Sequence, residues 1–423
     1  MLRRNVLYTC LIIIVLSLPF VLDYLGKKES KKADEIEFWQ YWSGPEKKPL
    51  EKLVNQFNQE NHGFTVKLRS ISLPRKKILM AITAGIPPDL VHLDGDMVND
   101  FALRNALLTI DFSELKINKS KFYENYLNIL KVKQRQMALP FMPTAEALHI
   151  NKTLLNKYDL KEPENLENLI AISEKIMTKS NYEEFGLLPT WPIWTGRIIV
   201  YLFGGSWAQE LENGDYQITA NAPENIKAWK WLVENFIKKI PQNKLQGFIE
   251  GNIAYQSPDN PFYSGKVALE TNGIWEYGFV KKFSPQFDIS VKALNATELT
   301  VDALAIPRGA RDYEKSLYFM SWLLKEDNIS YLAKEQNKFP TIKLSPEKRK
   351  VFLKNHKHPY VNVFMDLAES ENAYYFPHLS FSKEYKREIT KAFNSVLRLE
   401  TSPEKALFDL QVKILGTQKR SIN

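Results

Sequence analysis

Two acidic residues directly follow a short, mostly apolar run in this sequence. Residues 89–93 are typical of a buried strand, and Asp94 and Asp96 come immediately after it. Carboxylates at the end of a strand can accept hydrogen bonds from neighbouring hydroxyl groups of a polyol, so both side chains are candidate ligand contacts. The alternative is that Asp96 caps a helix that begins at Met97. The sequence is compatible with both interpretations.

A second set of candidate contacts ends the first predicted strand, residues 36–42. The ring of Trp42 and the backbone N–H groups of Ser43 and Gly44 could face a ligand there. Trp42 could equally pack in the core of the protein, since large aromatic side chains dominate protein interiors.

We find no set of residues that predicts catalysis. Asp94 and Asp96 could in principle serve a glycosidase, but their spacing does not reveal the gap of about 5–10 Å that two such carboxyl groups require. His356 and His358 lack helical spacing and a third ligand nearby, so we interpret them as a solvated pair. No phosphate-binding glycine loop with a following lysine is present, which excludes an ATPase. We therefore predict no catalytic residue, no metal and no cofactor.

The elements that would position these residues alternate between strand and helix. Predicted strands at residues 36–42, 64–71 and 89–93 are separated by helical patterns at residues 50–57 and 76–84. This alternation predicts an α/β fold with a parallel sheet, in which ligands bind beyond the carboxyl ends of the strands. Helices predominate later, around one further strand; they are expected at residues 165–178, 198–203, 222–240, 315–324 and within 359–415, and the strand at 301–307.

The composition is that of a large globular protein. The chain has 423 residues, of which 44% are hydrophobic and 25% charged, so it can bury more than one core. Its single cysteine, Cys10, excludes an intramolecular disulfide bond and a multi-cysteine metal site. The net charge of +8 comes from basic residues scattered among 49 acidic ones, so we predict no binding to nucleic acid.

The first 33 residues indicate export. Arg3 and Arg4 precede an uncharged, apolar run that extends from Asn5 to Leu22, and four lysines follow it. Residues 1–33 are therefore a signal peptide or an uncleaved membrane anchor, and because no small-x-small cleavage site follows the run, we favour an anchor at residues 5–25. The two arginines place the N-terminus in the cytoplasm and everything after residue 34 outside.

The order of several segments resembles the bacterial extracellular solute-binding proteins of the carbohydrate class, the maltose-binding-protein-like receptors of ABC importers. The resemblance spans nearly the whole exported chain. The matching segments are Phe38-Trp39-Gln40-Tyr41-Trp42-Ser43-Gly44, Leu53 to Asn61, Ala84-Gly85-Ile86-Pro87-Pro88-Asp89-Leu90-Val91, Leu139-Pro140 with Leu148 to Lys152, Gly204-Gly205, Ser264 to Ala268 with Asn272-Gly273-Ile274-Trp275, Ala305 to Ala310, and Ser402 to Leu407.

The resemblance implies a periplasmic-binding-protein type II fold, in which two α/β lobes enclose a cleft and close on a ligand about a hinge. We expect lobe one at 34–143 plus 298–345 and lobe two at 144–297 plus 346–423. The implied function is capture of a carbohydrate and its delivery to the permease subunits of an ABC importer. The implied protein is a monomer without enzymatic activity, held at the membrane through its N-terminal segment.

The resemblance also suggests ligand contacts in the second lobe. Trp275 follows Asn272 and Gly273 at the place where the family commonly stacks an aromatic ring on a sugar. The remaining implied contacts are Thr144 where the chain first crosses between lobes, Trp191 or Trp194 in an aromatic loop, and Tyr375 in a later aromatic cluster; each could instead serve packing or the hinge.

Two departures from the family pattern keep alternatives open. Asn165 and Leu166 stand where a tryptophan is usual, and Ile150 stands where an acidic residue or tyrosine is usual. The alternatives are an extracytoplasmic hydrolase or sensor subunit on the same fold, and a receptor for a phosphorylated polyol or a peptide. A phosphate ligand would require an arginine or lysine that faces the cleft.

Overall fold

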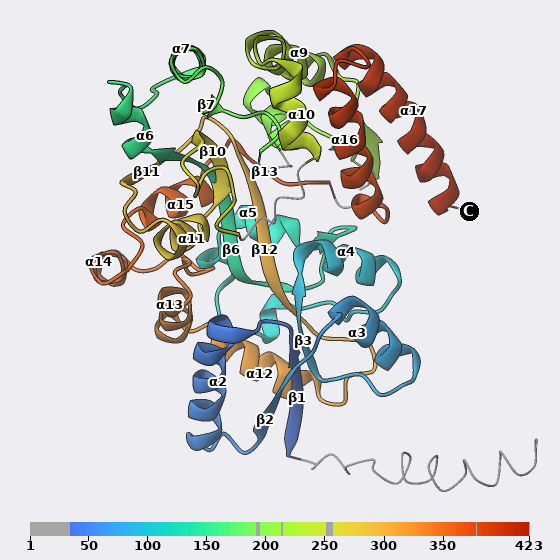
Figure 1. Cartoon of the computed structure of the whole chain (residues 1–423). Coiled ribbons are helices and arrows are strands. Elements are labelled where there is room, and N and C mark those ends of the chain that lie inside the picture. Colours follow the sequence, from blue (N-terminus) through green and yellow to red (C-terminus); the bar gives the residue numbers. More distant parts are fainter. Residues whose placement is uncertain (1–33, 192–194, 213–214, 251–256, 378, 423) are drawn as a thin grey trace, which may run out of the picture.

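The computed structural model describes residues 34–191, 195–212, 215–250, 257–377 and 379–422 (Figure 1). The predicted membrane anchor therefore lies outside the described residues. Among the residues that are described, no helix is both long and apolar enough to cross a membrane.

The first part of the chain forms the predicted alternation of strands and helices. Strands β1 (Glu35–Gln40), β2 (Thr65–Ser70) and β3 (Leu90–Asp94) lie parallel, with β1 between the other two. Helix α2 (Gly44–Gln59) joins β1 to β2, and α3 (Pro74–Thr83) joins β2 to β3. The parallel arrangement confirms the α/β prediction and places the ends of β1 and β3 on the same edge of the sheet.

Two long strands connect the two halves of the molecule. β6 (Leu139–Asn151) and β12 (Thr297–Ala305) pair antiparallel to each other, and β12 also pairs antiparallel to β3. On the far side, β6 pairs antiparallel to β10 (Val267–Gly273), which is parallel to β7 (Phe185–Leu187). The result is a mixed sheet in the order β2-β1-β3-β12-β6-β10-β7, with β11 (Ile289–Lys292) on β6 and β13 (Ala373–Tyr374) on β12.

Two separate apolar cores define two lobes, one at each end of β6 and β12 (Figure 1). The first core gathers side chains from β1, β3 and α12 (Tyr313–Leu323), and the second gathers side chains from α7 (Leu166–Lys179), α9 (Pro223–Asn235), α16 (Ser382–Leu397) and α17 (Pro403–Ile422). Residues of α14 and α15 also pack in the first core, although the lobe boundary expected from the family would place residues 346–368 in the second lobe.

The remaining elements surround these cores. The helices are α4 (Gly95–Leu103), α5 (Glu124–Ile129), α6 (Lys152–Lys157), α7 (Leu166–Lys179), α8 (Thr195–Ile198), α9 (Pro223–Asn235), α10 (Gln242–Glu250), α11 (Glu276–Phe283), α12 (Tyr313–Leu323), α13 (Glu326–Glu335), α14 (Pro346–Lys354), α15 (Val361–Ala368), α16 (Ser382–Leu397) and α17 (Pro403–Ile422). Short strands β4 (Lys131–Val132) and β5 (Arg135–Gln136), and β8 (Ala208–Glu210) and β9 (Tyr216–Ile218), form two hairpins; 3₁₀ turns occupy Phe112–Glu114, Lys119–Lys121, Ile199–Phe203 and Ile237–Lys239.

Some predicted elements differ in extent from those observed. The predicted helix at residues 222–240 is α9 followed by a separate 3₁₀ turn, because Phe236 leaves the helical conformation with φ −132° and ψ −57°. The expected strand at residues 36–42 ends at Gln40, and the region 359–415 contains β13 in addition to its helices.

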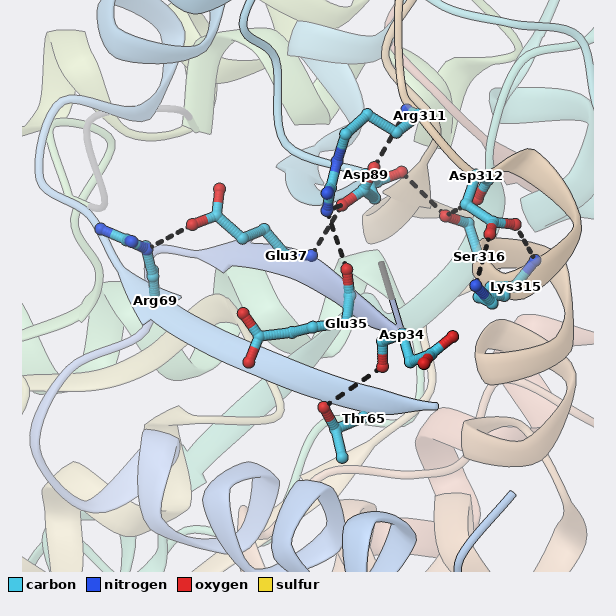
Figure 2. Close-up of polar contacts among 10 residues, drawn as sticks. All are labelled: Asp34, Glu35, Glu37, Thr65, Arg69, Asp89, Arg311, Asp312, Lys315 and Ser316. Carbon is cyan, nitrogen blue, oxygen red and sulfur yellow. Dashed lines mark hydrogen bonds and ion pairs between the residues drawn. The ribbon is translucent and has the colours of Figure 1, made fainter. Parts of the chain in front are cut away.

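One of the sequence segments that carry the family resemblance, residues 84–91, supplies a buried carboxylate that is bonded to residues next to two other such segments (Figure 2). Asp89 is fully buried and accepts the backbone N–H of Glu37 at 2.8 Å, the backbone N–H of Arg311 at 3.0 Å and the Arg311 guanidinium at 2.8 Å. Because every bond to the buried charge is made, the cluster ties β1 and β3 to the chain that returns from β12 into α12. This part of the resemblance therefore reflects a structural requirement of the first lobe.

Candidate functional site

Two neighbouring cavities lie between the lobes, and Tyr375 lines both of them. The inner cavity has a volume of about 170 Å³ and the outer one about 660 Å³. The inner wall is formed by Asp94, Gly95, Asp96, Ile129, Leu299, Thr300, Val301, Tyr375, Phe376 and Lys386. The outer wall includes Asn99, Asn128, Lys131, Gln134, Glu210, Asp215, Tyr216, Tyr375, Phe381 and Gln418. Three of the predicted contacts, Asp94, Asp96 and Tyr375, therefore come together in one place.

Asp94 is the residue that caps α4. Its side chain accepts a hydrogen bond of 2.9 Å from the backbone N–H of Asp96, so the cap lies two residues earlier than the alternative considered from sequence. Burial raises the pKa of the Asp94 carboxyl to about 7, and the charges of Asp96 and Asp302 add to this effect. Asp94 can therefore exchange a proton near neutral pH.

Asp96 points away from its own helix terminus and reaches the other lobe. Its carboxylate lies 2.6 Å from the ammonium of Lys386 on α16. The same ammonium lies 4.8 Å from the centroid of the Phe376 ring. Because α4 belongs to the first lobe and α16 to the second, this ion pair bridges the cleft.

A polar cluster behind Asp94 was not predicted from the sequence. Tyr41 donates a hydrogen bond to Asp302, and its ring stacks on His92 with centroids 4.2 Å apart. Lys338 approaches the Asp302 carboxylate at 4.0 Å. Burial opposes ionisation of Asp302, but hydrogen bonding and charge from His92, together with the charge of Lys338, hold its pKa below the ordinary value. Asp302 therefore stays ionised and contributes negative charge next to Asp94.

The only sequence signal for this cluster was an aspartate within an apolar run. Asp302 interrupts the predicted strand 301–307, and Tyr41 lies 261 residues before it in the chain. Sequence periodicity cannot predict a contact between residues so far apart in the chain, because it shows only which residues share a face of one helix or strand.

The predicted contacts at the end of β1 lie in different surroundings. Trp42 is only 4% exposed and stacks on Phe141 in the first core, with ring centroids 5.1 Å apart. Ser43 and Gly44 are exposed at the start of α2, and Gly44 adopts a left-handed φ of +55°. None of the three lines the two interlobe cavities described above, so their role in binding stays a prediction.

The predicted aromatic contacts of the second lobe differ in their exposure to solvent. Trp191 is buried, and its indole N–H donates to the Glu270 carboxylate at 2.9 Å. Trp275 is partly exposed and its ring lies against Gly273, where a Cβ atom would come within 2.3 Å of the indole. Trp194 lies outside the described residues. A glycine at position 273 is therefore required for the observed position of the Trp275 ring.

Thr144 lies on β6 where this strand passes between the lobes. Its backbone carbonyl accepts a hydrogen bond of 2.9 Å from the hydroxyl of Tyr126, and its own hydroxyl makes no hydrogen bond among the described residues. This leaves Thr144 compatible with both predicted roles, ligand contact and hinge residue.

The outer cavity adds candidate contacts that sequence analysis missed. Amide side chains and aromatic rings share its wall, a combination that suits hydroxyl groups and the apolar faces of sugar rings. They are Asn99, Asn128, Gln134, Tyr216, Phe381 and Gln418. They come from helices, loops and a short strand spread over both lobes, so spacing along the chain could not have grouped them.

A half-buried arginine, Arg197, is paired with a carboxylate near the crossing strands. Arg197 donates two hydrogen bonds to Glu298, of 3.0 Å from Nε and 2.6 Å from Nη2. Glu298 is 1% exposed and lies at the start of β12. Lys386 likewise forms an ion pair with Asp96. Two cations that could have bound a phosphate group are therefore already paired with carboxylates.

Comparison with known proteins identifies the class. Residues 52–358 match the family model for the bacterial extracellular solute-binding proteins, and this chain belongs to that family. The multiple sugar-binding protein of Streptococcus mutans is 21% identical over 286 residues, which cover 64% of this chain and 67% of that protein. A putative binding protein of Brucella abortus is 23% identical over 295 residues, covering 66% and 69%.

Solved structures confirm the two-lobed fold. A cyclo/maltodextrin-binding protein complexed with maltotetraose is 21% identical, with a TM-score of 0.74 over 94% of this chain and 99% of that one. The substrate-binding protein Lmo0181 of Listeria monocytogenes, in complex with cycloalternan, is 18% identical, with a TM-score of 0.73 over 90% and 98%.

Proposed function

We propose that this protein is the substrate-binding component of an ABC importer and captures a carbohydrate between its two lobes. The observation that supports this most is the composition of the interlobe cavities, where carboxylates, amides and aromatic rings line one space. Carboxylates and amides accept and donate hydrogen bonds to vicinal hydroxyls, while rings such as Tyr375 contact the C–H face of a sugar. Family membership and the sugar ligands named for similar structures agree with this assignment.

A neutral carbohydrate fits the inner cavity better than a phosphorylated polyol. A phosphate group needs an arginine or lysine whose charge is available, and Lys386, which lines this cavity, is held by Asp96. Negative charge on Asp94 in the same wall would repel a phosphate. In the outer cavity, Lys131 contacts the Asn128 amide oxygen at 2.7 Å and is a cation that a phosphate could use.

Binding without chemical conversion is the activity we propose. The relatives compared above are described as binding proteins. In addition, Asp94 caps a helix and Asp96 is ion-paired, so these carboxyls are engaged in structural bonds rather than arranged across a cleft as a hydrolytic pair.

We propose lobe one at 34–143 plus 298–345 and lobe two at 144–297 plus 346–423, with α14 and α15 packed against the first core. A ligand that contacts both lobes favours their closed arrangement, and the importer's permease would recognise that state. We further propose a monomer that acts outside the cytoplasm, held at the membrane by residues 5–25.

A thermal-shift screen of the purified protein against mono- and oligosaccharides tests the proposal. A true ligand raises the melting temperature as its concentration exceeds its dissociation constant, and chromatography should recover the sugar intact. Tyr375→Ala should weaken the shift, because Tyr375 lines both cavities. Turnover of a glycoside, or stabilisation by phosphorylated polyols alone, would contradict the assignment.

A further inference from the structure

A buried polar network lies beneath the predicted aromatic contacts of the second lobe. It consists of Trp191, Tyr263, Glu270, Asn272 and Glu276, each of which is at most 6% exposed. Two of its members are acids, and both acids are completely buried. Burial of two carboxyl groups side by side is costly unless their charge is reduced.

The hydrogen bonds of the network converge on these two acids. Glu270 accepts from the Trp191 indole at 2.9 Å and from the Asn272 amide at 3.1 Å. Glu276 accepts from the same Asn272 nitrogen at 2.8 Å and from the Tyr263 hydroxyl at 2.9 Å. The two acids are therefore joined through one amide nitrogen.

The carboxyl groups of Glu270 and Glu276 both lie within hydrogen-bond distance of the same Asn272 nitrogen, at 3.1 and 2.8 Å, and both are fully buried. Two ionised carboxyls that close together and removed from water repel each other strongly, and one proton held between them removes one of the two charges. Burial, followed by the charge of Glu276, raises the pKa of Glu270 well above the ordinary value.

The network joins the two segments of the second lobe that carry predicted aromatic contacts. Trp191 belongs to the aromatic loop, Asn272 precedes Gly273, and Glu276 follows Trp275 as the first residue of α11. We propose that Glu270 and Glu276 are positioning residues that share one proton and thereby hold Trp191 and the Gly273–Trp275 turn in the arrangement that binds the sugar. This inference rests on the proposed function for its link to binding, but not for the shared proton.

The histidines near Glu270 and Glu276 do not change their protonation state near neutral pH. On the adjacent strand β6, His149 bonds to the Asn272 carbonyl at 3.1 Å, and burial lowers its pKa to about 4. His358 is 1% exposed, so its interpretation as a solvated residue was wrong; its pKa is lowered to about 3, by burial first and then by the charges of His149 and His356. Tyr263 and Trp191 are the donors from the other segments. Loss of the shared proton therefore occurs only as the pH rises, and it leaves two adjacent buried charges.

Infrared spectra of the ligand-free full chain test the shared proton directly. At pH 8, where most of the Asp94 carboxyl is ionised, the wild type should show the carbonyl band of a protonated carboxylic acid. The band should disappear in the double variant Glu270→Gln/Glu276→Gln. Glu388→Gln is the matched control, because Glu388 is also a buried glutamate, 4% exposed, but is paired with lysines that lower its pKa to about 2. A band that is absent from the wild type, or unchanged in the double variant, would overturn the shared proton.

The positioning role has a separate readout. Near-ultraviolet circular dichroism of the wild type should change between pH 7 and pH 10, as the aromatic rings lose their fixed environment, and Glu276→Gln should suppress this change.

With maltotetraose as the probe, Glu276→Gln should bind within about twofold of the wild type at pH 7, while Glu276→Ala should bind at least tenfold more weakly. Equal affinity of all three proteins, or a Glu276→Gln variant as weak as the Ala variant, would overturn the positioning role. Failure of every sugar to bind would contradict the proposed function, whereas the infrared band and the ligand-free dichroism would still decide the inference.

Discussion

At the scale of single residues, the surroundings of the cleft change the pKa of the ionisable groups that line it. Asp94 is the clearest case, since burial and two neighbouring acids, Asp96 and Asp302, make its ionisation unfavourable. The residue serves as helix cap and as cavity wall at the same time, so we expect its protonation state to affect both stability and the proposed binding.

Asp94→Asn should remove part of the pH dependence of stability. The pKa of Asp94 is about 7 in the folded protein and ordinary in the unfolded chain, so the folded state binds the extra proton between about pH 4 and pH 7. The free energy of unfolding therefore falls as pH rises through this window, by at most about 1.4 kcal/mol per pH unit for one proton. Urea unfolding at pH 4.5, 5.5 and 6.5 should show a shallower decline in the variant. Parallel curves for the two proteins would contradict this expectation.

Trp275→Ala should lower sugar affinity at least tenfold while changing the melting temperature by only a few degrees. The ring is partly exposed, and loss of a stacking contact removes about 1–2 kcal/mol of binding free energy. Gly273→Ala provides a matched test, because the added Cβ would lie 2.3 Å from the indole and must displace it. Calorimetric titration of both variants should show weakened binding. Affinity equal to that of the wild type in Trp275→Ala would remove this residue from the site.

At the scale of elements, helix α7 leaves unfilled space in the second lobe. A cavity of about 310 Å³ has an apolar side formed by Leu148, Leu166, Leu169, Leu202 and Leu294, and a polar side that includes Glu164, Asn165, Lys292 and Asn295. Leu166 begins α7, and together with Asn165 it stands where the family resemblance leads us to expect tryptophan. An indole ring at Leu166 would occupy more of the apolar side than the leucine does.

Leu166→Trp should therefore stabilise the protein. Filling an apolar cavity commonly adds about 0.5–2 kcal/mol to the free energy of unfolding. Val351→Trp is a suitable control, because Val351 is 60% exposed on α14 and offers no cavity. Chemical denaturation should show a higher midpoint for Leu166→Trp alone. A lower midpoint would mean that the pocket cannot accept an indole ring.

At the scale of the whole molecule, the two lobes are linked by the crossing strands and by an ion pair across the cleft. The pair of Asp96 and Lys386 is accessible to solvent, with side chains 43% and 20% exposed, so salt should weaken it. Its place at the edge of the inner cavity means that it acts only when the lobes are close together.

Lys386→Met should shift the ligand-free protein towards open arrangements of the lobes. Small-angle X-ray scattering should give a larger radius of gyration for the variant than for the wild type, and high salt should reduce the difference by opening the wild type. Lys391→Met serves as the control, because Lys391 pairs with Glu388 on its own helix and makes no contact across the cleft in the described structure. An identical radius for wild type and Lys386→Met at low salt would show that the pair does not hold the lobes together.

The fold and part of the site could be predicted because they depend on local patterns. The alternation of strands and helices in the first 103 residues follows from side-chain periodicity, and Asp94 and Asp96 were found because they end a strand. The sequence order of the matching segments indicated the family. All of these features depend on residues that are close to one another in the sequence.

Only the tertiary structure brought Tyr41 to Asp302, Asp96 to Lys386 and Glu270 to Glu276. It also buried Trp42 and selected Asp94 instead of Asp96 as the helix cap. These outcomes depend on which faces meet when two cores form around β6 and β12, and on how far each carboxyl is removed from water. A sequence records which groups can ionise or stack, but desolvation and contact across long separations exist only in the folded chain.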